Sequence, residues 1–108
     1  MEFLLAHLVG DFIIQTDWMA NGKKRKSLIC MIHVITYLLP FFFLQFLWWQ
    51  LVLIGIQHFI QDRWGFVVWF MNKAGHKKFA SSPMSPWSII VTDNIFHLVW
   101  IYFVINYF

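Results

Sequence analysis

The sequence predicts an all-α protein built as a four-helix transmembrane bundle. Hydrophobic residues make up 60% of the 108 residues, charged residues make up only 12%, and the mean hydropathy is +0.64. A soluble domain carries about 25% charged residues, so much of this surface is expected to face something other than water. Four apolar stretches of about 20 residues also occur, which is the length needed to cross a bilayer core.

The four predicted spans follow one another with short connections. They cover residues 2–20, 27–49, 51–72 and 87–108. Asn21-Gly22 is a helix-stop signal after the first span, and Ser85-Pro86 supplies an N-cap with proline at the first position of the last helix. Short connections make consecutive helices antiparallel neighbours. We therefore expect a single integral-membrane domain over residues 1–108.

Basic residues cluster between the spans. One block is residues 23–26, and the other comprises Lys73, Lys77 and Lys78. The positive-inside rule places such loops in the cytoplasm. The sequence thus predicts a multi-pass protein of the bacterial inner (cytoplasmic) membrane, with both termini outside, membrane lipid as a partner and no nucleic-acid partner. The single Cys30 excludes an internal disulfide.

Three spans carry a histidine and an aspartate four residues apart. These pairs are His7 and Asp11, His58 and Asp62, and Asp93 and His97. The last span runs in the opposite direction, and there the aspartate precedes the histidine. All three helices therefore place the carboxylate nearer the cytoplasm and the imidazole deeper, in a layer about 10 Å thick. The recurring pattern also suggests two pseudo-repeated helical hairpins.

This layer predicts a metal site. An aspartate inside a bilayer costs about 2.5–3.5 kcal/mol, and Arg63 is the only Lys or Arg well inside a span. Helical bundles build metal centres from such side chains, although a purely structural His-Asp network is the alternative. The predicted ligands are His7, Asp11, His33, His58, Asp62, Asp93 and His97. Mixed nitrogen and oxygen ligands fit Zn²⁺ best, with Mn²⁺ and Fe²⁺ as alternatives.

Further polar residues have predicted roles around this layer. Asp93 or Asp62 could act as a general base. Arg63 either binds an anionic substrate or extends its charged end to the cytoplasm. The candidates for hydrogen-bonding the ligands are Gln15, Gln57, Gln61, Thr92 and Asn94.

The order of the polar motifs along the chain resembles that of a known family. The motifs are His7-Leu8-Val9-Gly10-Asp11-Phe12-Ile13-Ile14-Gln15, a basic turn, His33, His58-x-x-x-Asp62 and Asp93-Asn94-Ile95-Phe96-His97. That family comprises small bacterial and phage membrane proteins catalogued as a domain of unknown function, with an H-L-x-x-D-F-x-x-Q opening. It is similar, more distantly, to membrane-bound metal-dependent hydrolases. The resemblance implies a metal and a hydrolytic role for His7, Asp11, His58, Asp62, Asp93 and His97.

Three functions follow as hypotheses. The first is a metal-dependent hydrolase acting on a lipid or lipid-linked phosphate or ester near the cytoplasmic leaflet, with Arg63 and the two lysine loops attracting an anionic head group. The second is a proton or metal transport protein or channel, which would require a homo-oligomer. The third is a non-catalytic phage or bacterial protein that binds a host membrane protein.

Overall fold

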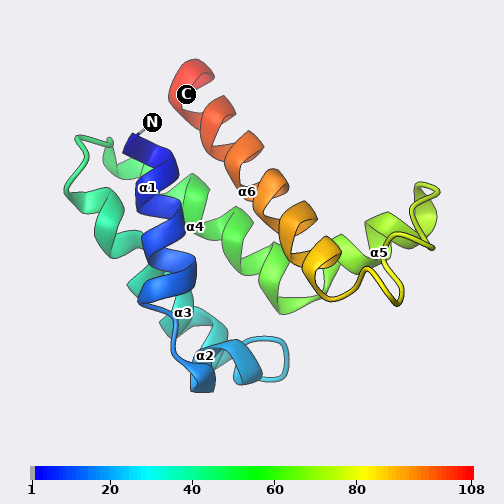
Figure 1. The fold of residues 1–108 in the computed structure, drawn as a ribbon. Coiled ribbons are helices and arrows are strands. Elements are labelled where there is room, and N and C mark those ends of the chain that lie inside the picture. The colour runs from blue at the N-terminus through cyan, green and yellow to red at the C-terminus, as the bar shows by residue number, and fades with distance from the viewer. Residues whose placement is uncertain (1) are drawn as a thin grey trace.

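The computed structural model describes residues 2–108, and this part of the chain is all-α (Figure 1). The elements are α1 (Glu2–Leu8), the π-helical turn η1 (Val9–Ile13), α2 (Asp17–Gly22), α3 (Ser27–Phe42), α4 (Trp48–Arg63), α5 (Phe66–Lys73) and α6 (Trp87–Tyr107). The all-α class is thus confirmed. The last predicted span, residues 87–108, corresponds to α6, which ends one residue earlier.

The predicted first and third spans are each broken by a local signal. Thr16 is extended and caps α2, because its Oγ1 accepts a hydrogen bond from the Met19 backbone N–H at 3.3 Å. The chain therefore leaves the first helix before residue 16 and starts a new one. Gly65 has φ +63°, a left-handed conformation that interrupts a helix, and it separates α4 from α5.

The four-helix transmembrane bundle is consequently wrong. The helices α3 and α4 have 16 residues each, which makes them about 24 Å long, whereas a bilayer core is about 30 Å thick. Within residues 2–108, α6 is the one helix both long enough and apolar enough to cross a membrane.

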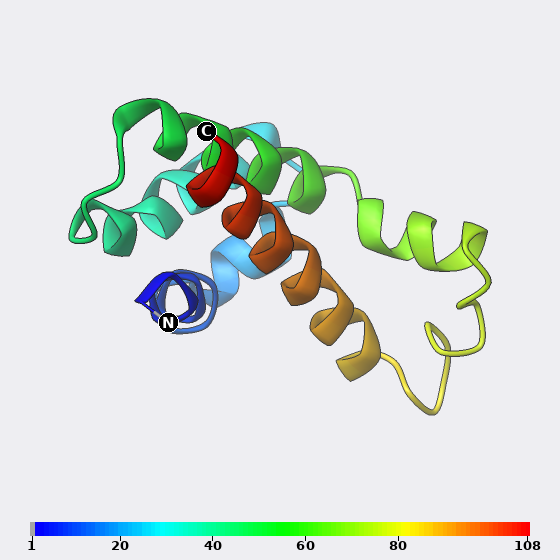
Figure 2. The same cartoon turned by 90° about the horizontal axis from the view of Figure 1, so that it is seen from above.

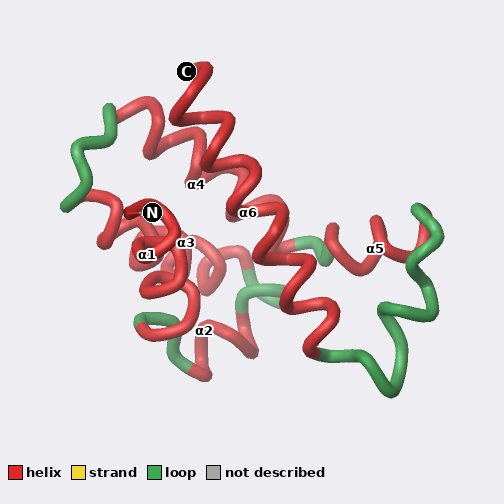
Figure 3. Tube along the Cα trace, turned by 45° about the horizontal axis from the view of Figure 1, so that its top comes forward, coloured by secondary structure: helices red, strands yellow, loops and turns green. Residues whose placement is uncertain are grey.

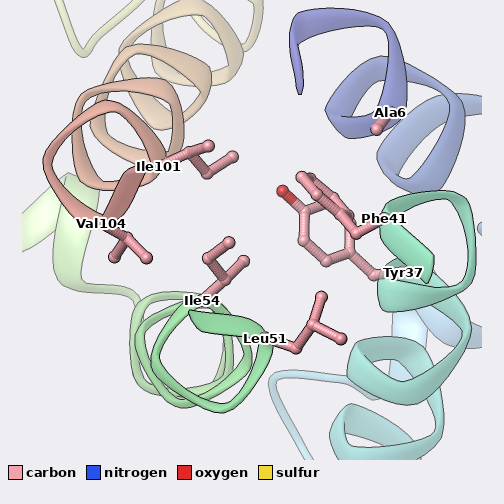
Figure 4. Close-up of a cluster of buried hydrophobic side chains, with 7 residues drawn as sticks. All are labelled: Ala6, Tyr37, Phe41, Leu51, Ile54, Ile101 and Val104. Atoms are coloured by element: carbon pink, nitrogen blue, oxygen red, sulfur yellow. The ribbon is translucent and has the colours of Figure 1, made fainter. Parts of the chain in front are cut away.

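Four helices surround an apolar core. Side chains from α1, α3, α4 and α6 point toward a common centre (Figure 4). They are Ala6, Tyr37, Phe41, Leu51, Ile54, Ile101 and Val104. By contrast, α5 and the loop after it extend to one side, away from α1–α3 (Figures 1 and 2).

The same helix faces change from apolar to polar along their length. On α4, Leu51 and Ile54 are followed by the buried His58 and Asp62. On α6 the buried His97 precedes Ile101, and on α3 the buried His33 precedes Tyr37. Because residues three or four apart share a helix face, each helix contributes to the core at one level and to a polar layer at the next. Figure 3 shows these helices in red and the loops that join them in green.

The first helix reaches this layer through a close backbone contact. A Cβ at Gly10 would lie 2.7 Å from the Tyr37 carbonyl oxygen and 2.8 Å from its Cδ1. Only glycine allows η1 to approach α3 this closely. Asp11 follows directly, within the π-helical turn, and such turns frequently occur at functional sites.

Candidate metal centre

Four buried side chains from three elements converge in the polar layer. They are Asp11, His33, His58 and Asp62. One ligand atom from each lies within 4.8 Å of the others. The Nε2 atoms of His33 and His58 are 2.9 Å apart, and they lie 3.1 and 3.0 Å from Asp62 Oδ2. Ligands bonded at ~2.0–2.1 Å to one tetrahedral ion are themselves ~3.3 Å apart, so this spacing suits a metal.

A second group adjoins the first on α6. Asp93, His97 and Asp11 again place one ligand atom each within 4.8 Å of one another. His97 Nε2 lies 3.4 Å from Asp93 Oδ2 and 3.4 Å from Asp62 Oδ1. Six of the seven predicted ligands are therefore brought together, including the lone histidine of α3.

Hydrogen bonding within the described residues leaves one oxygen of Asp11 without a partner. Asp11 is only 5% exposed, and its Oδ1 has no hydrogen-bond partner although His33 Nε2 and His58 Nε2 lie 3.3 and 3.5 Å away. A buried unpaired carboxylate oxygen is costly. Coordination to a cation would satisfy this oxygen, and the imidazoles and carboxylates around it could hold a divalent metal.

Ionisation favours cation binding as well. Burial alone would raise the pKa of Asp11, but the adjacent His33 and His58 outweigh burial and lower it. Burial likewise opposes ionisation of Asp62, but His58, with His33 and His97, holds its pKa well below the usual range. Both carboxylates are therefore negatively charged at neutral pH.

The ring of His97 is oriented by amide side chains on α4. Gln57 Nε2 donates to Gln61 Oε1, and Gln61 Nε2 donates to Asp93 Oδ1 at 2.7 Å. Gln57 Oε1 therefore remains as the acceptor for His97 Nδ1, 3.3 Å away. This assignment leaves His97 Nε2 facing the cluster, 3.3 Å from Gln61 Nε2 and 3.4 Å from oxygens of Asp62 and Asp93. Nε2 is therefore the ring nitrogen that would bind a metal. Gln57 and Gln61 thus contact predicted ligands through hydrogen bonds.

His7 lies outside both groups. Asn94 Oδ1 can only accept, so His7 Nε2 donates to it at 2.6 Å, and Tyr37 Oη then donates to His7 Nδ1 at 2.7 Å. Burial lowers the pKa of His7, in agreement with this neutral ring. Both ring nitrogens are engaged, and the predicted equivalence of His7 and His58 does not extend to their contacts.

The remaining predicted residues differ in position. Gln15 Nε2 donates to the Asp11 carbonyl at 3.1 Å, whereas Thr92 Oγ1 bonds the Ser88 carbonyl within α6. Arg63 Nη1 donates to the Lys24 carbonyl at 2.6 Å, so its guanidinium holds the basic loop instead of facing the cluster.

Sequence reasoning placed Lys23 and Lys24 in a loop that attracts an anionic head group, but it did not predict that they contact Asp62. Lys23 Nζ lies 2.9 Å from Asp62 Oδ2, and Lys24 Nζ donates to the Asp62 carbonyl at 3.1 Å. Burial opposes the charged form of Lys23, but Asp62 outweighs it and raises the lysine pKa. A loop joining the first two predicted helices, next to a charged site, was the available signal.

A cavity of about 320 Å³ opens beside the cluster. The three carboxylates of the two groups line it, together with both lysines. Its other polar lining residues are Gln15, Gln61 and Asn94. The candidate metal centre is therefore accessible from a space that can hold a small ligand or the head group of a larger one.

The sequence was compared with curated proteins, solved structures and protein families. No curated protein and no solved structure matches it. A family model described as "Protein of unknown function (DUF3307)" matches residues 1–108, which is the whole chain. The protein therefore belongs to the DUF3307 family.

Proposed function

We propose that the protein is a metal-dependent hydrolase acting on a phosphate or carboxylic ester, with a lipid or lipid-linked compound as substrate. The observation that carries this proposal is the cavity that joins carboxylates of the candidate metal centre to two lysines. Catalytic metal sites keep a position open to water or substrate, and a cavity beside buried ligands meets that requirement.

The donor set suits Zn²⁺, with Mn²⁺ and Fe²⁺ as alternatives, because it combines imidazole nitrogens with carboxylate oxygens. A bound divalent ion supplies Lewis-acid chemistry, which polarises a phosphoryl or acyl oxygen and makes water more acidic. Asp11, His33, His58 and Asp62 would hold it.

Asp93 is the better placed of the two predicted general bases. Both oxygens of Asp62 face histidines, and Oδ2 also bonds Lys23. Asp93 is half-buried, lines the cavity, and can accept the proton of the attacking water. Hydrolysis then forms the bond from the water oxygen to phosphorus or the acyl carbon and breaks the ester bond, and the leaving oxygen takes up a proton.

Lys23 and Lys24 favour an anionic substrate. Their ammonium groups border the same cavity as the carboxylates, so a phosphate oxygen could contact a lysine and the metal together. Lys23 thereby takes the anion-binding role that the sequence suggested for Arg63.

A membrane location is the second part of the proposal. The helix α6 has 21 residues, and an 18-residue stretch within it has a mean hydropathy of 1.7. Its large apolar side chains at positions 91, 95, 99 and 103 are exposed, as are others on the rest of the surface. Exposed apolar surface on this scale marks contact with a membrane or another protein. A carbonate-resistant membrane pellet would support the location, and release into the supernatant would contradict it.

Purified protein should be assayed with p-nitrophenyl phosphate, p-nitrophenyl acetate and vesicles containing phosphatidic acid. We expect hydrolysis of at least one, its loss on chelation and its return with Zn²⁺ or Mn²⁺. Metal-loaded, folded protein that hydrolyses none of these would contradict the phosphate and ester assignment.

Two lysine variants sharpen the assignment of the substrate. Lys23→Met should weaken use of the anionic substrates while metal content is retained. Lys73→Met changes an exposed lysine outside the cavity and serves as the matched control. Equal activity of both variants would remove Lys23 from substrate binding.

A further inference from the structure

We infer that the centre is binuclear, with one divalent ion in each of the two ligand groups. The inference rests on the metal binding proposed above and extends it to the number of ions. The first group is Asp11, His33, His58 and Asp62, and the second is Asp11, Asp93 and His97. Asp11 belongs to both, so its carboxylate is placed to bridge them.

Asp62 supports the same division. Its Oδ2 lies 3.1 and 3.0 Å from the Nε2 atoms of His33 and His58, whereas its Oδ1 lies 3.4 Å from His97 Nε2. The two oxygens of one carboxylate thus face different histidine sets. Carboxylates that span two ions in this way occur in helical-bundle di-iron and di-manganese proteins.

Hydrogen bonds to α4 orient the α6 side chains of the second group independently of the first group. His97 is 1% exposed, and the Gln57 amide oxygen orients it with Nε2 toward the carboxylates. Gln61 holds Asp93 through Oδ1, while Asp93 Oδ2 lies 3.4 Å from His97 Nε2. Oδ2 would be the ligand, and Oδ1 keeps a lone pair for the proton of water.

A single six-coordinate ion fits less well. Opposite ligands of an octahedral ion are about 4.2 Å apart, so all six ligand atoms would lie within that range of one another. In the described part of the chain the six side chains do not form one such group. They form two groups that share Asp11, and within each group one ligand atom from every residue lies within 4.8 Å of the others.

Charge also favours two ions. Three carboxylates and two divalent ions leave a net charge of +1, and Lys23 raises it to +2. This charge complements a phosphate dianion in the adjoining cavity. In two-metal hydrolases the ions are about 3.5–4 Å apart and contact both the attacking and the leaving oxygen.

Elemental analysis of the purified full chain loaded with Zn²⁺, after removal of free metal, tests the inference. We expect two ions per chain in the wild type and about one in His97→Ala. His76→Ala removes an exposed loop histidine and should retain two. Electron paramagnetic resonance of the Mn²⁺-loaded wild type gives a second readout, and we expect the signal of a spin-coupled pair.

The outcomes separate the two proposals. One ion per chain with an uncoupled Mn²⁺ signal would overturn the binuclear centre and leave the metal-dependent hydrolase intact. No bound ion would overturn both. If His97→Ala fails to fold, the wild-type stoichiometry and Mn²⁺ signal decide the question alone.

Discussion

The Nε2 atoms of His33 and His58 lie 2.9 Å apart, although 25 residues separate them in the chain. Both rings are fully buried, and their Nδ1 atoms have no partner among the described residues. Each imidazole therefore directs its only engaged nitrogen at the same point, where Asp62 Oδ2 also lies. A cation at that point satisfies all three atoms at once.

Removing one of these imidazoles should remove the ion of the first group. His58→Ala is expected to lower Zn²⁺ affinity by at least tenfold, because the ion loses one of its two ligands from α4. Isothermal titration with Zn²⁺ measures the change. His76→Ala is the control, and an unchanged affinity in His58→Ala would exclude His58 as a ligand.

Metal affinity should fall as the pH is lowered. Burial opposes protonation of His33, but Asp11 and Asp62 outweigh it and raise the His33 pKa above its ordinary value of 6.5. A proton must leave this ring before it can bind a metal. Protons therefore begin to compete with the metal for this ring above pH 6.5. As the pH falls further, the metal affinity should drop by about tenfold per pH unit for each proton displaced. Titrations between pH 8 and 5.5 test this slope, which a pH-independent affinity would contradict.

Tyr37 should matter for stability and not for metal content. Its hydroxyl donates to His7 Nδ1, and its ring stacks on His58 with centroids 3.8 Å apart. Tyr37→Phe keeps the stacking but leaves a buried nitrogen unpaired, at a cost of about 1–3 kcal/mol. Chemical denaturation and elemental analysis are the two measurements. A loss of metal without a loss of stability would move Tyr37 into the metal site.

Gly10 should tolerate no side chain. Alanine there would place Cβ against the Tyr37 backbone, which cannot rotate away. Gly10→Ala is expected to destabilise the fold by about 1–3 kcal/mol and to weaken metal binding by displacing Asp11. Stability of Gly10→Ala equal to that of the wild type would show that η1 need not approach α3 closely.

The ammonium group of Lys23 should compete with a metal ion for Asp62. Its Nζ bonds Asp62 Oδ2, the same oxygen that faces His33 and His58. Lys23→Met should therefore leave Zn²⁺ affinity unchanged or raise it, whereas Lys73→Met should leave it unchanged. A clear fall in affinity, measured by the same titration, would show that Lys23 supports the site instead of competing for it.

Much of the site could be predicted from the sequence because helix direction and residue spacing decide which polar residues share a level. Because the last helix was expected to run opposite to the third, the reversed order of Asp93 and His97 predicted that the His-Asp pairs of both helices share a level. The helices α4 and α6 do place Asp93 and His97 against Gln61 and Asp62. The helix α6 contains no glycine, proline or internal cap and follows directly after Pro86, so its bounds were predictable.

The rest depended on local conformations that hydropathy does not report. Thr16 and Gly65 divide two predicted spans, because a capping side chain and a left-handed glycine end a helix regardless of how apolar its neighbours are. The π-helical turn at Asp11 changes how α1 presents its side chains, so the matched spacing of His7 and His58 did not place them in equivalent contacts. No spacing rule connects Lys23 to Asp62, which is 39 residues away.

Anomalous X-ray diffraction at the zinc absorption edge, on crystals of the Zn²⁺-loaded protein, tests the central claim most directly. The account predicts an anomalous peak bounded by His33 Nε2, His58 Nε2, Asp62 and Asp11, at about 2.0–2.2 Å from its ligand atoms. Well-ordered density for these four side chains with no peak among them, or with zinc bound elsewhere on the chain, would contradict it.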